Sequence, residues 1–424
     1  MEILTLVRDA LWGMPTVILL SAFGLYFTYR LGFFNPFKLL KAFGKTFFSL
    51  KGSGGGGISS LAALSTALGG TVGVGSISGI ALSIALGGAG SIFWMWVCSF
   101  LGMGLKYAEV ALAHNRRVLT DRGFSGGAMY CLRAMGKPRS AFLFALLTVG
   151  MASCGGSIVQ AGAISAALEG TFKSKVLSAL CVGAASLAVV SGGKKWITKF
   201  NTLALPTVSL LFVGTCLLVL IRNIGALPDA FARIFGEAFG VRQAAGGISG
   251  AMMIRVGCTR GTFSHEAGMG SSPLSYSASS ETSSHVQGLW GVTEVFIDSF
   301  VVSTLVALSL LCMGADSVNA VFTLSFGAWG GVFYAVAISI FAFAAIVSWG
   351  FYGEEALFYL CPKGKAVFTL FKISVAFFAF IGALMSEQSA FAGADIWGAL
   401  MLFPNLYLLF KSRSDIIALA KQKG

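Results

Sequence analysis

Charged residues are scarce in this chain. Only 11% of its 424 residues are Asp, Glu, Lys or Arg, whereas a soluble domain carries about 25%. Hydrophobic residues make up 56% of the sequence, and the mean hydropathy is +0.82. Because so few charges cannot coat a water-exposed surface, the composition indicates an integral membrane protein.

The sequence also lacks the patterns of a metal centre, a disulfide framework and the common membrane enzymes. Its eight cysteines include no Cys-x-x-Cys pair, and Cys98, Cys181, Cys216 and Cys312 lie in apolar runs. We therefore expect buried free thiols. No His-Glu-x-x-His motif occurs, and no pair of carboxylates lies deep in an apolar run. We expect neither an enzyme nor a bound cofactor.

Eleven apolar runs have the length of membrane-spanning helices. A helix needs about 20 residues to cross the hydrocarbon core, and the runs are continuous rather than alternating, which excludes a β-barrel. The expected helices are 10–30, 58–86, 90–113, 141–168, 176–191, 200–222, 244–275, 288–313, 330–351, 366–386 and 394–410. No basic cluster precedes the first run, so we expect a retained helix rather than a signal peptide.

The basic residues predict how these helices are oriented. The net charge is +13, but Lys and Arg gather in short loops between apolar runs, a pattern that does not favour a nucleic-acid partner. With the N-terminus outside, the cytoplasmic segments hold 21 Lys and Arg and the outside segments hold six. This bias predicts a cytoplasmic C-terminus and an odd number of helices. Length and composition suit a multi-pass protein of a bacterial inner membrane.

Glycine and proline interrupt two of the runs. The run near 69–79 reads GGTVGVGSISG, and the run near 257–273 reads GCTRGTFSHEAGMGSSP. Gly and Pro break helices, and charges at membrane depth are costly unless they line a cavity. The two runs are five helices apart, which predicts two five-helix repeats of opposite orientation with a site where the broken helices meet. Alternatively, the glycines only allow close helix packing.

The predicted fold class is therefore an all-α integral membrane protein in five parts. These are an N-terminal helix with a basic loop (1–57), a first repeat (58–225), an amphipathic linker (226–243), a second repeat (244–411) and a cytoplasmic tail (412–424).

Two long stretches resemble the alanine or glycine:cation symporter family. The first, TALGGTVGVGSISGIALSIALGGAGSIFWMWVCSFLGMGLKYAEVALA, is similar to the family pattern TALAGTVGTGNIAGVATAI followed by GGPGAIFWMW, GM and KYAE. The second, CTRGTFSHEAGMGSSPLSYSASS, resembles RGLFSNEAGMGSAPIAHAAA. The resemblance runs in order through nearly the whole chain. It implies a leucine-transporter-like fold of inverted five-helix repeats with an extra N-terminal helix, and sodium-coupled uptake of alanine, glycine or a similar amino acid.

The chain departs from the family pattern at polar positions. Val74 and Ser76 stand where the family has Thr and Asn, and His265 stands where it has Asn. Ala344 and Ala345 replace a hydroxyl pair that supplies oxygens to sodium in related folds. Because a methyl group offers no oxygen to a hard cation, the coupling ion is either sodium held by other oxygens or a proton.

The two charged ends of a small neutral amino acid need opposite partners. Its carboxylate suits N–H groups at the start of a helix, around 71–76, and its ammonium suits carbonyls near a helix end, around 261–264. The residues expected at the substrate site are Thr71, Gly73, Gly75, Ser76, Gln160, Phe263, Ser264, His265, Met269, Gly270 and Trp349. Those expected to couple the ion are Gly70, Ser76, His265, Glu266 and Asp298.

Some of these residues also have a structural interpretation. His265 is either a packed, hydrogen-bonded side chain or a titrating group whose charge replaces sodium. Arg260 and Glu266 can pair with each other, or with Asp298 and Glu109, as a gate, or they form structural ion pairs near the interface. In the same way, Trp349 either closes the pocket or belongs to the core or the lipid-facing surface.

A secondary transporter fits these features best. We expect a monomer that works by alternating access, with a small neutral amino acid, a coupling cation and membrane lipid as its partners. A channel would show a filter or a ring of charges repeated by symmetry, and neither is evident in the sequence. A transport-impaired amino-acid sensor is the remaining alternative.

Overall fold

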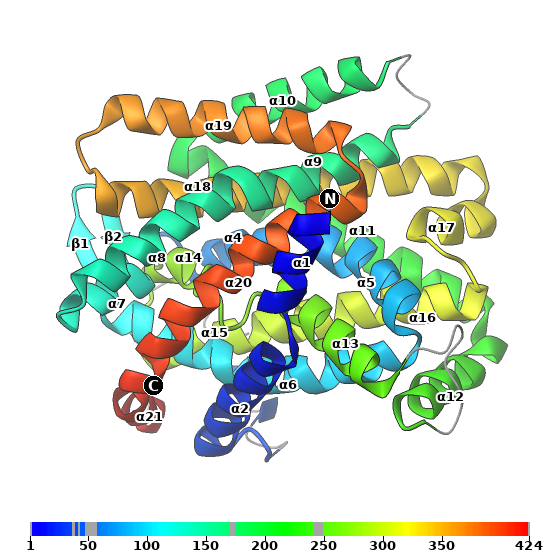
Figure 1. The fold of residues 1–424 in the computed structure, drawn as a ribbon, viewed down its shortest axis with the longest axis horizontal. Coiled ribbons are helices and arrows are strands. Elements are labelled where there is room, and N and C mark those ends of the chain that lie inside the picture. The colour runs from blue at the N-terminus through cyan, green and yellow to red at the C-terminus, as the bar shows by residue number, and fades with distance from the viewer. Residues whose placement is uncertain are drawn as a thin grey trace.

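The structure, a computed structural model, describes residues 2–35, 39–40, 43–46, 57–169, 174–240 and 249–422 (Figure 1). Within these ranges nearly all regular structure is helical, as expected for an all-α membrane protein. The exception is an antiparallel hairpin of β1 (Val118–Thr120) and β2 (Gly123–Ser125), which the sequence did not predict. The glycine run at 54–56 and the end of the predicted linker, 241–243, lie outside the described residues.

The helices follow one another along the whole chain. Those of the first half are α1 (Glu2–Leu11), α2 (Met14–Leu31), α4 (Ser60–Thr71), α5 (Val74–Gly87), α6 (Gly90–Asn115), α7 (Ala128–Ala134), α8 (Pro138–Gly150), the π-helix η1 (Met151–Gly155), α9 (Gly156–Ala167), α10 (Lys175–Ser191), α11 (Gly193–Arg222), the 3-10 helix η2 (Ile224–Ala226) and α12 (Leu227–Ala238). Those of the second half are α13 (Gly250–His265), α14 (Pro273–Ser277), α15 (Ser284–Val295), the π-helix η3 (Phe296–Ser303), α16 (Thr304–Met313), α17 (Val318–Phe326), α18 (Ala328–Leu360), α19 (Lys365–Leu384), α20 (Glu387–Lys411) and α21 (Arg413–Lys421).

Among the described residues, eight helical stretches are long and apolar enough to cross a membrane. They coincide with eight of the eleven predicted runs. The other three runs correspond to α6, which carries Lys106 and Glu109, to α10, which has 17 residues, and to α13 with α14, which are separated by a loop. The total of eleven crossings therefore stays a prediction.

Both glycine-rich runs contain a break between two helices. The first break separates α4, which ends at Thr71, from α5, which begins at Val74. The second begins where Glu266 ends α13 in a left-handed conformation, and Gly268 and Gly270 continue it with φ of 96° and 75°. Glycine adopts positive φ without the steric cost that a side chain adds. The breaks therefore lie inside the two stretches that the sequence singled out.

The broken helices lie between two groups of longer helices (Figure 1). The helices α9, α10, α18 and α19 run along one side of the molecule, and α2, α6 and α15 run along the other. A short parallel bridge between Ile58 and Ser279 ties the start of α4 to the chain that follows α14. Ile58 N–H donates to Ala278 O at 3.0 Å, and Ser280 N–H donates to Ile58 O at 2.7 Å. These hydrogen bonds therefore join the two broken-helix segments at the start of α4.

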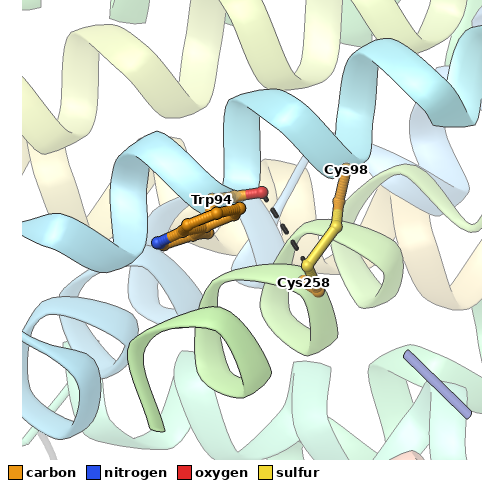
Figure 2. Close-up of a disulfide and its surroundings, with 3 residues drawn as sticks. All are labelled: Trp94, Cys98 and Cys258. Atoms are coloured by element: carbon orange, nitrogen blue, oxygen red, sulfur yellow. Dashed lines mark hydrogen bonds between the residues drawn. A yellow bond between two sulfur atoms is a disulfide. The ribbon is translucent and has the colours of Figure 1, made fainter. Parts of the chain in front are cut away.

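A disulfide joins α6 to α13, which corrects the expectation that Cys98 is a free thiol (Figure 2). Cys98 of α6 is bonded to Cys258 of α13 across 160 residues of sequence, with the two Cα atoms 5.4 Å apart. The helices pack closely here because Gly257 has no side chain, and an added Cβ would lie 2.2 Å from Ser91 O. The close-packing interpretation therefore applies to this glycine of the second run. Cys216 is free and buried, whereas Cys181 is free but exposed.

Candidate functional site

Asp298 connects the two broken helices. It lies in η3, a π-helical turn between α15 and α16, and its side chain is fully buried. Its Oδ1 accepts a hydrogen bond from Ser76 Oγ at 2.5 Å, and its Oδ2 accepts from Ser264 Oγ at 2.8 Å and from Ser299 Oγ at 3.1 Å. Ser76 lies in the first turn of α5 and Ser264 in the last turn of α13. We call Asp298 and these three serines the Asp298 cluster. Such π-helical turns are frequent at functional sites.

The start of α5 presents its backbone beside a buried amide. The first N–H groups of a helix have no acceptor within the helix and attract anions. A Cβ added at Gly73, which precedes α5, would lie 3.9 Å from Gln160 Oε1. Gln160 is buried, and its Oε1 accepts no hydrogen bond from the residues that the structure describes. The first N–H groups of α5 and an unused buried acceptor therefore meet at the first break.

Phe263 lies next to the Asp298 cluster. A Cβ added at Gly75 would be 3.5 Å from Phe263 Cδ1 and 3.5 Å from Ser264 Cα, so α5 and α13 approach closely there. The Phe263 ring packs edge-to-face on Phe391 of α20, with ring centroids 5.5 Å apart. This aromatic pair therefore separates the cluster from the space between α13 and α20.

A second polar cluster lies beside the last turn of α4. Asn201 Nδ2 donates to Ser348 Oγ at 2.8 Å, and Ser348 Oγ donates to Ala344 O at 2.9 Å. A Cβ added at Gly69 would lie 2.5 Å from Ser348 Oγ. Asn201 Oδ1 is buried and accepts no hydrogen bond from the described part of the chain. Positions 344 and 345 carry no hydroxyl group, but Ser348 supplies one a turn later on the same helix, on the side that faces α4.

Buried charges hold the loop that follows α13. Glu109 of α6 accepts hydrogen bonds from the backbone N–H groups of Gly268 and Gly270, the latter at 2.9 Å. Lys106 Nζ, one turn before Glu109, lies 3.5 Å from Glu294 Oε1, and both side chains of this pair are fully buried. Backbone groups that leave a helix in a buried position need such partners. These charges therefore stabilise the second break.

Arg260 and Glu266 have other partners than the gate interpretation predicts. Arg260 forms an ion pair with Asp395 of α20, whose side chain is fully buried. Glu266 accepts a hydrogen bond from Ser271 Oγ at 2.5 Å. The chain turns at Glu266, so its carboxylate contacts the loop that follows α13. Arg260 lies within α13, and its side chain contacts α20. The two side chains therefore serve different parts of the fold.

His265 contacts α6 rather than the Asp298 cluster. Its Nδ1 accepts a hydrogen bond from Ala267 N–H at 3.0 Å, and a Cβ added at Gly102 would lie 2.9 Å from its Cε1. With both cysteines of the disulfide, it lines a cavity of 20 Å³ between α2, α6 and α13. Successive helix residues point about 100° apart, so Ser264 reaches Asp298 and its neighbour does not. The ring is packed and accepts one hydrogen bond at Nδ1, its buried Nε2 has no partner among the described residues, and a titrating role stays a prediction.

The remaining predicted residues surround the broken helices but face other elements. Thr71 Oγ1 donates to Ala67 O at 3.2 Å, within α4. A Cβ added at Gly70 would contact Tyr352, and one added at Gly270 would contact Asn405. The side chain of Trp349 is buried against Gly156, and that of Met269 is buried against Gly398. The sequence did not predict Ser299, Asn201, Ser348 and Asp395 as site residues. An acid in an apolar run is a functional signal at membrane depth, so Asp395 could have been found, whereas Asn201 and Ser348 carry no such signal.

The arrangement offers opposite polarities at two neighbouring helix ends. The N-terminal dipole end of α5 favours a carboxylate, and the C-terminal end of α13 favours an ammonium group. The Asp298 carboxylate adds negative charge beside both ends, since Ser76 of α5 and Ser264 of α13 both donate to it. The two helix ends are therefore complementary to the two ends of an amino acid.

Comparison with known proteins identifies one family. The model of the sodium:alanine symporter family matches residues 1–422. An uncharacterized transporter of Haemophilus influenzae is 37% identical, over 98% of this chain and 94% of that protein. The sodium/alanine symporter AgcS of Methanococcus maripaludis is 34% identical, over 94% of this chain and 92% of that protein. The probable sodium/glutamine symporter GlnT of Bacillus subtilis is 33% identical, over 96% and 87% respectively.

Proposed function

This chain belongs to the sodium:alanine symporter family, a family of transporters and not of enzymes, and from this premise we propose that it takes up a small neutral amino acid together with sodium. Alanine, glycine and serine are the substrates that we propose. The relatives named above include an alanine symporter and a probable glutamine symporter.

The observation that carries the proposal is the Asp298 cluster. A buried carboxylate that binds one hydroxyl from each broken helix supports a site whose occupancy depends on how the two helices are placed. We infer that the substrate carboxylate binds the N–H groups at the start of α5, beside Gly73. Its ammonium group then binds near Ser264 and Asp298.

The second polar cluster supports a place for the cation. Sodium binds oxygen ligands, and Ser348 Oγ, Asn201 Oδ1 and the Ala344 carbonyl lie together beside α4. We infer that these oxygens replace the hydroxyls that the family pattern has at 344 and 345. A proton is the alternative coupling ion, because fewer oxygens are present than that pattern provides.

We further propose an inverted repeat with alternating access. Each proposed half opens with a broken helix and closes with a proline-containing helix, Pro206 in α11 and Pro404 in α20. We place the N-terminus outside and the C-terminus in the cytoplasm of a bacterial inner membrane, with the chain acting as a monomer.

Uptake of labelled alanine into proteoliposomes tests the proposal. One set receives an inward sodium gradient, and a second set receives an inward proton gradient without sodium. We expect accumulation that saturates with alanine and is driven by sodium. Accumulation with the proton gradient alone would replace the coupling ion, non-saturating flux would indicate a channel, and binding without transport would indicate a sensor.

A further inference from the structure

A separate cavity of 350 Å³ lies between α1, α13, α20 and the end of α5. Charged side chains of both signs line it. Arg8 and Asp9 come from α1, and Asp9 Oδ1 lies 3.4 Å from Arg255 Nη1 of α13. The buried pair of Arg260 and Asp395 forms its inner wall. The cavity therefore has a polar outer rim and an ion pair at its base.

Each side chain of the ion pair at the base has one buried polar atom that the pair leaves unused. Arg260 Nη2 binds Asp395 Oδ2, whereas Arg260 Nη1 and Asp395 Oδ1 have no hydrogen-bond partner among the described residues. Thr259 Oγ1, which also lines the cavity, is likewise buried without a partner in that part of the chain. All three side chains are more than nine-tenths buried. Buried polar atoms left unpaired are costly, so a ligand that pairs them gains binding energy.

The unpaired atoms of Arg260 and Asp395 have charges opposite to those of the two charged groups of an amino acid. Arg260 Nη1 is a cationic donor and suits a carboxylate, and Asp395 Oδ1 is an anionic acceptor and suits an ammonium group. We propose that this cavity is a second subsite for a zwitterionic α-amino acid, which bridges Arg260 and Asp395 without breaking their ion pair. The inference rests on the proposed function for the nature of the ligand, and it adds a site that the proposed function does not contain.

The rings of Phe263 and Phe391 lie between the subsite and the Asp298 cluster. The Arg260 guanidinium carbon lies 5.4 Å from the centroid of the Phe263 ring and 5.2 Å from that of Phe391. On its other side, Phe263 borders Gly75 at the start of α5. A substrate released from the Arg260–Asp395 pair reaches the cluster when these two rings part. With the N-terminus outside, the subsite lies on the outer side and is filled first.

Stoichiometry of alanine binding tests the inference. Purified protein in detergent with sodium is dialysed to equilibrium against labelled alanine at saturation. We expect two alanines per wild-type chain. Ala392→Trp fills the cavity from α20, and Thr259→Trp fills it from α13, and neither variant replaces a residue of the ion pair. Each variant should bind one alanine, a twofold loss. Gly75→Val, which blocks the cluster beside Phe263, should also bind one, and the double variant Ala392→Trp with Gly75→Val should bind none.

A matched control places the same ring elsewhere. Ala204→Trp lies in the apolar groove between α11 and α18 and should keep both sites. One alanine per wild-type chain, lost with Gly75→Val and kept in both cavity-filling variants, would overturn the second subsite and leave the proposed function standing. A wild-type chain that binds no alanine at all would overturn both.

Discussion

Asp298 is the residue on which the site depends most directly. Three serine hydroxyls donate to its two carboxylate oxygens, and two of these serines come from different broken helices. Hydrogen bonds to a charged group contribute about 1.5–3 kcal/mol each, so loss of the charge weakens the contact between α5 and α13. The neutral amide of asparagine also replaces one acceptor oxygen by a donor.

Asp298→Asn should therefore abolish most transport while the protein still folds. We expect the maximal rate of alanine uptake into proteoliposomes to fall at least about tenfold, since about 1.4 kcal/mol corresponds to a factor of ten. Asp316→Asn makes the same change at an exposed loop residue and should leave uptake unaltered. A variant that elutes normally in gel filtration and transports at the wild-type rate would show that the cluster is only structural.

At the residue scale the sequence identified candidates but not their partners. Ser76 and Ser264 follow from the two glycine-rich motifs, and Asp298 follows from an acid in an apolar run. That Ser76 and Asp298 touch could not be read from the sequence, because 222 residues separate them. The same holds for Asn201 and Ser348, since helix faces meet only after tertiary packing. The pairing of Arg260 failed for this reason, as Asp395 lies 135 residues away.

At the scale of elements, the loop after α13 depends on left-handed glycines. Gly270 has a φ of 75°, and a Cβ added there would lie 2.9 Å from Asn405 Oδ1. Gly270→Ala should destabilise the folded protein by about 1–3 kcal/mol, because a non-glycine residue in this region is strained. We expect a lower melting temperature for the purified protein. Gly214→Ala, at a helical position with nothing within 4 Å, is the control and should not lower it. Equal melting temperatures for the two variants would contradict the role of this glycine.

The disulfide between α6 and α13 also belongs to the scale of elements, and no local sequence pattern predicts it. It ties a broken helix to the neighbouring helix α6, so the two move together. Alkylation of the denatured chain without reductant should add six groups, one for each free cysteine, and reduction should raise this to eight. Intact mass spectrometry makes the measurement. Cys98→Ala should give seven with or without reductant, and eight groups on the unreduced wild type would disprove the bond.

At the scale of the whole molecule, the two termini of the chain lie near opposite ends of α20 (Figure 1). Near its start, Trp12 Nε1, just after α1, donates to Asp395 O at 2.8 Å. After its end, α21 is held to the end of α6 by an ion pair of 2.6 Å between Arg116 and Asp415. The stretch from Asp395 to Lys411 rises about 24 Å at 1.5 Å per residue, close to the thickness of the hydrocarbon core. An odd number of crossings, which the basic residues predict, would place the two termini on opposite sides of the membrane.

Labelling of the termini in whole cells tests the orientation. In a chain with Cys181→Ser, which removes the exposed thiol of α10, a membrane-impermeant maleimide should label Leu6→Cys in intact cells, because Leu6 is exposed and α1 is placed outside. Ser414→Cys, exposed on α21, should be labelled only after the membrane is permeabilised. The 21 basic residues of the cytoplasmic segments resist translocation, which gives the expected direction. The reverse pattern would invert the orientation and place the second subsite on the cytoplasmic side. Labelling of both sites in intact cells would remove one crossing from the fold.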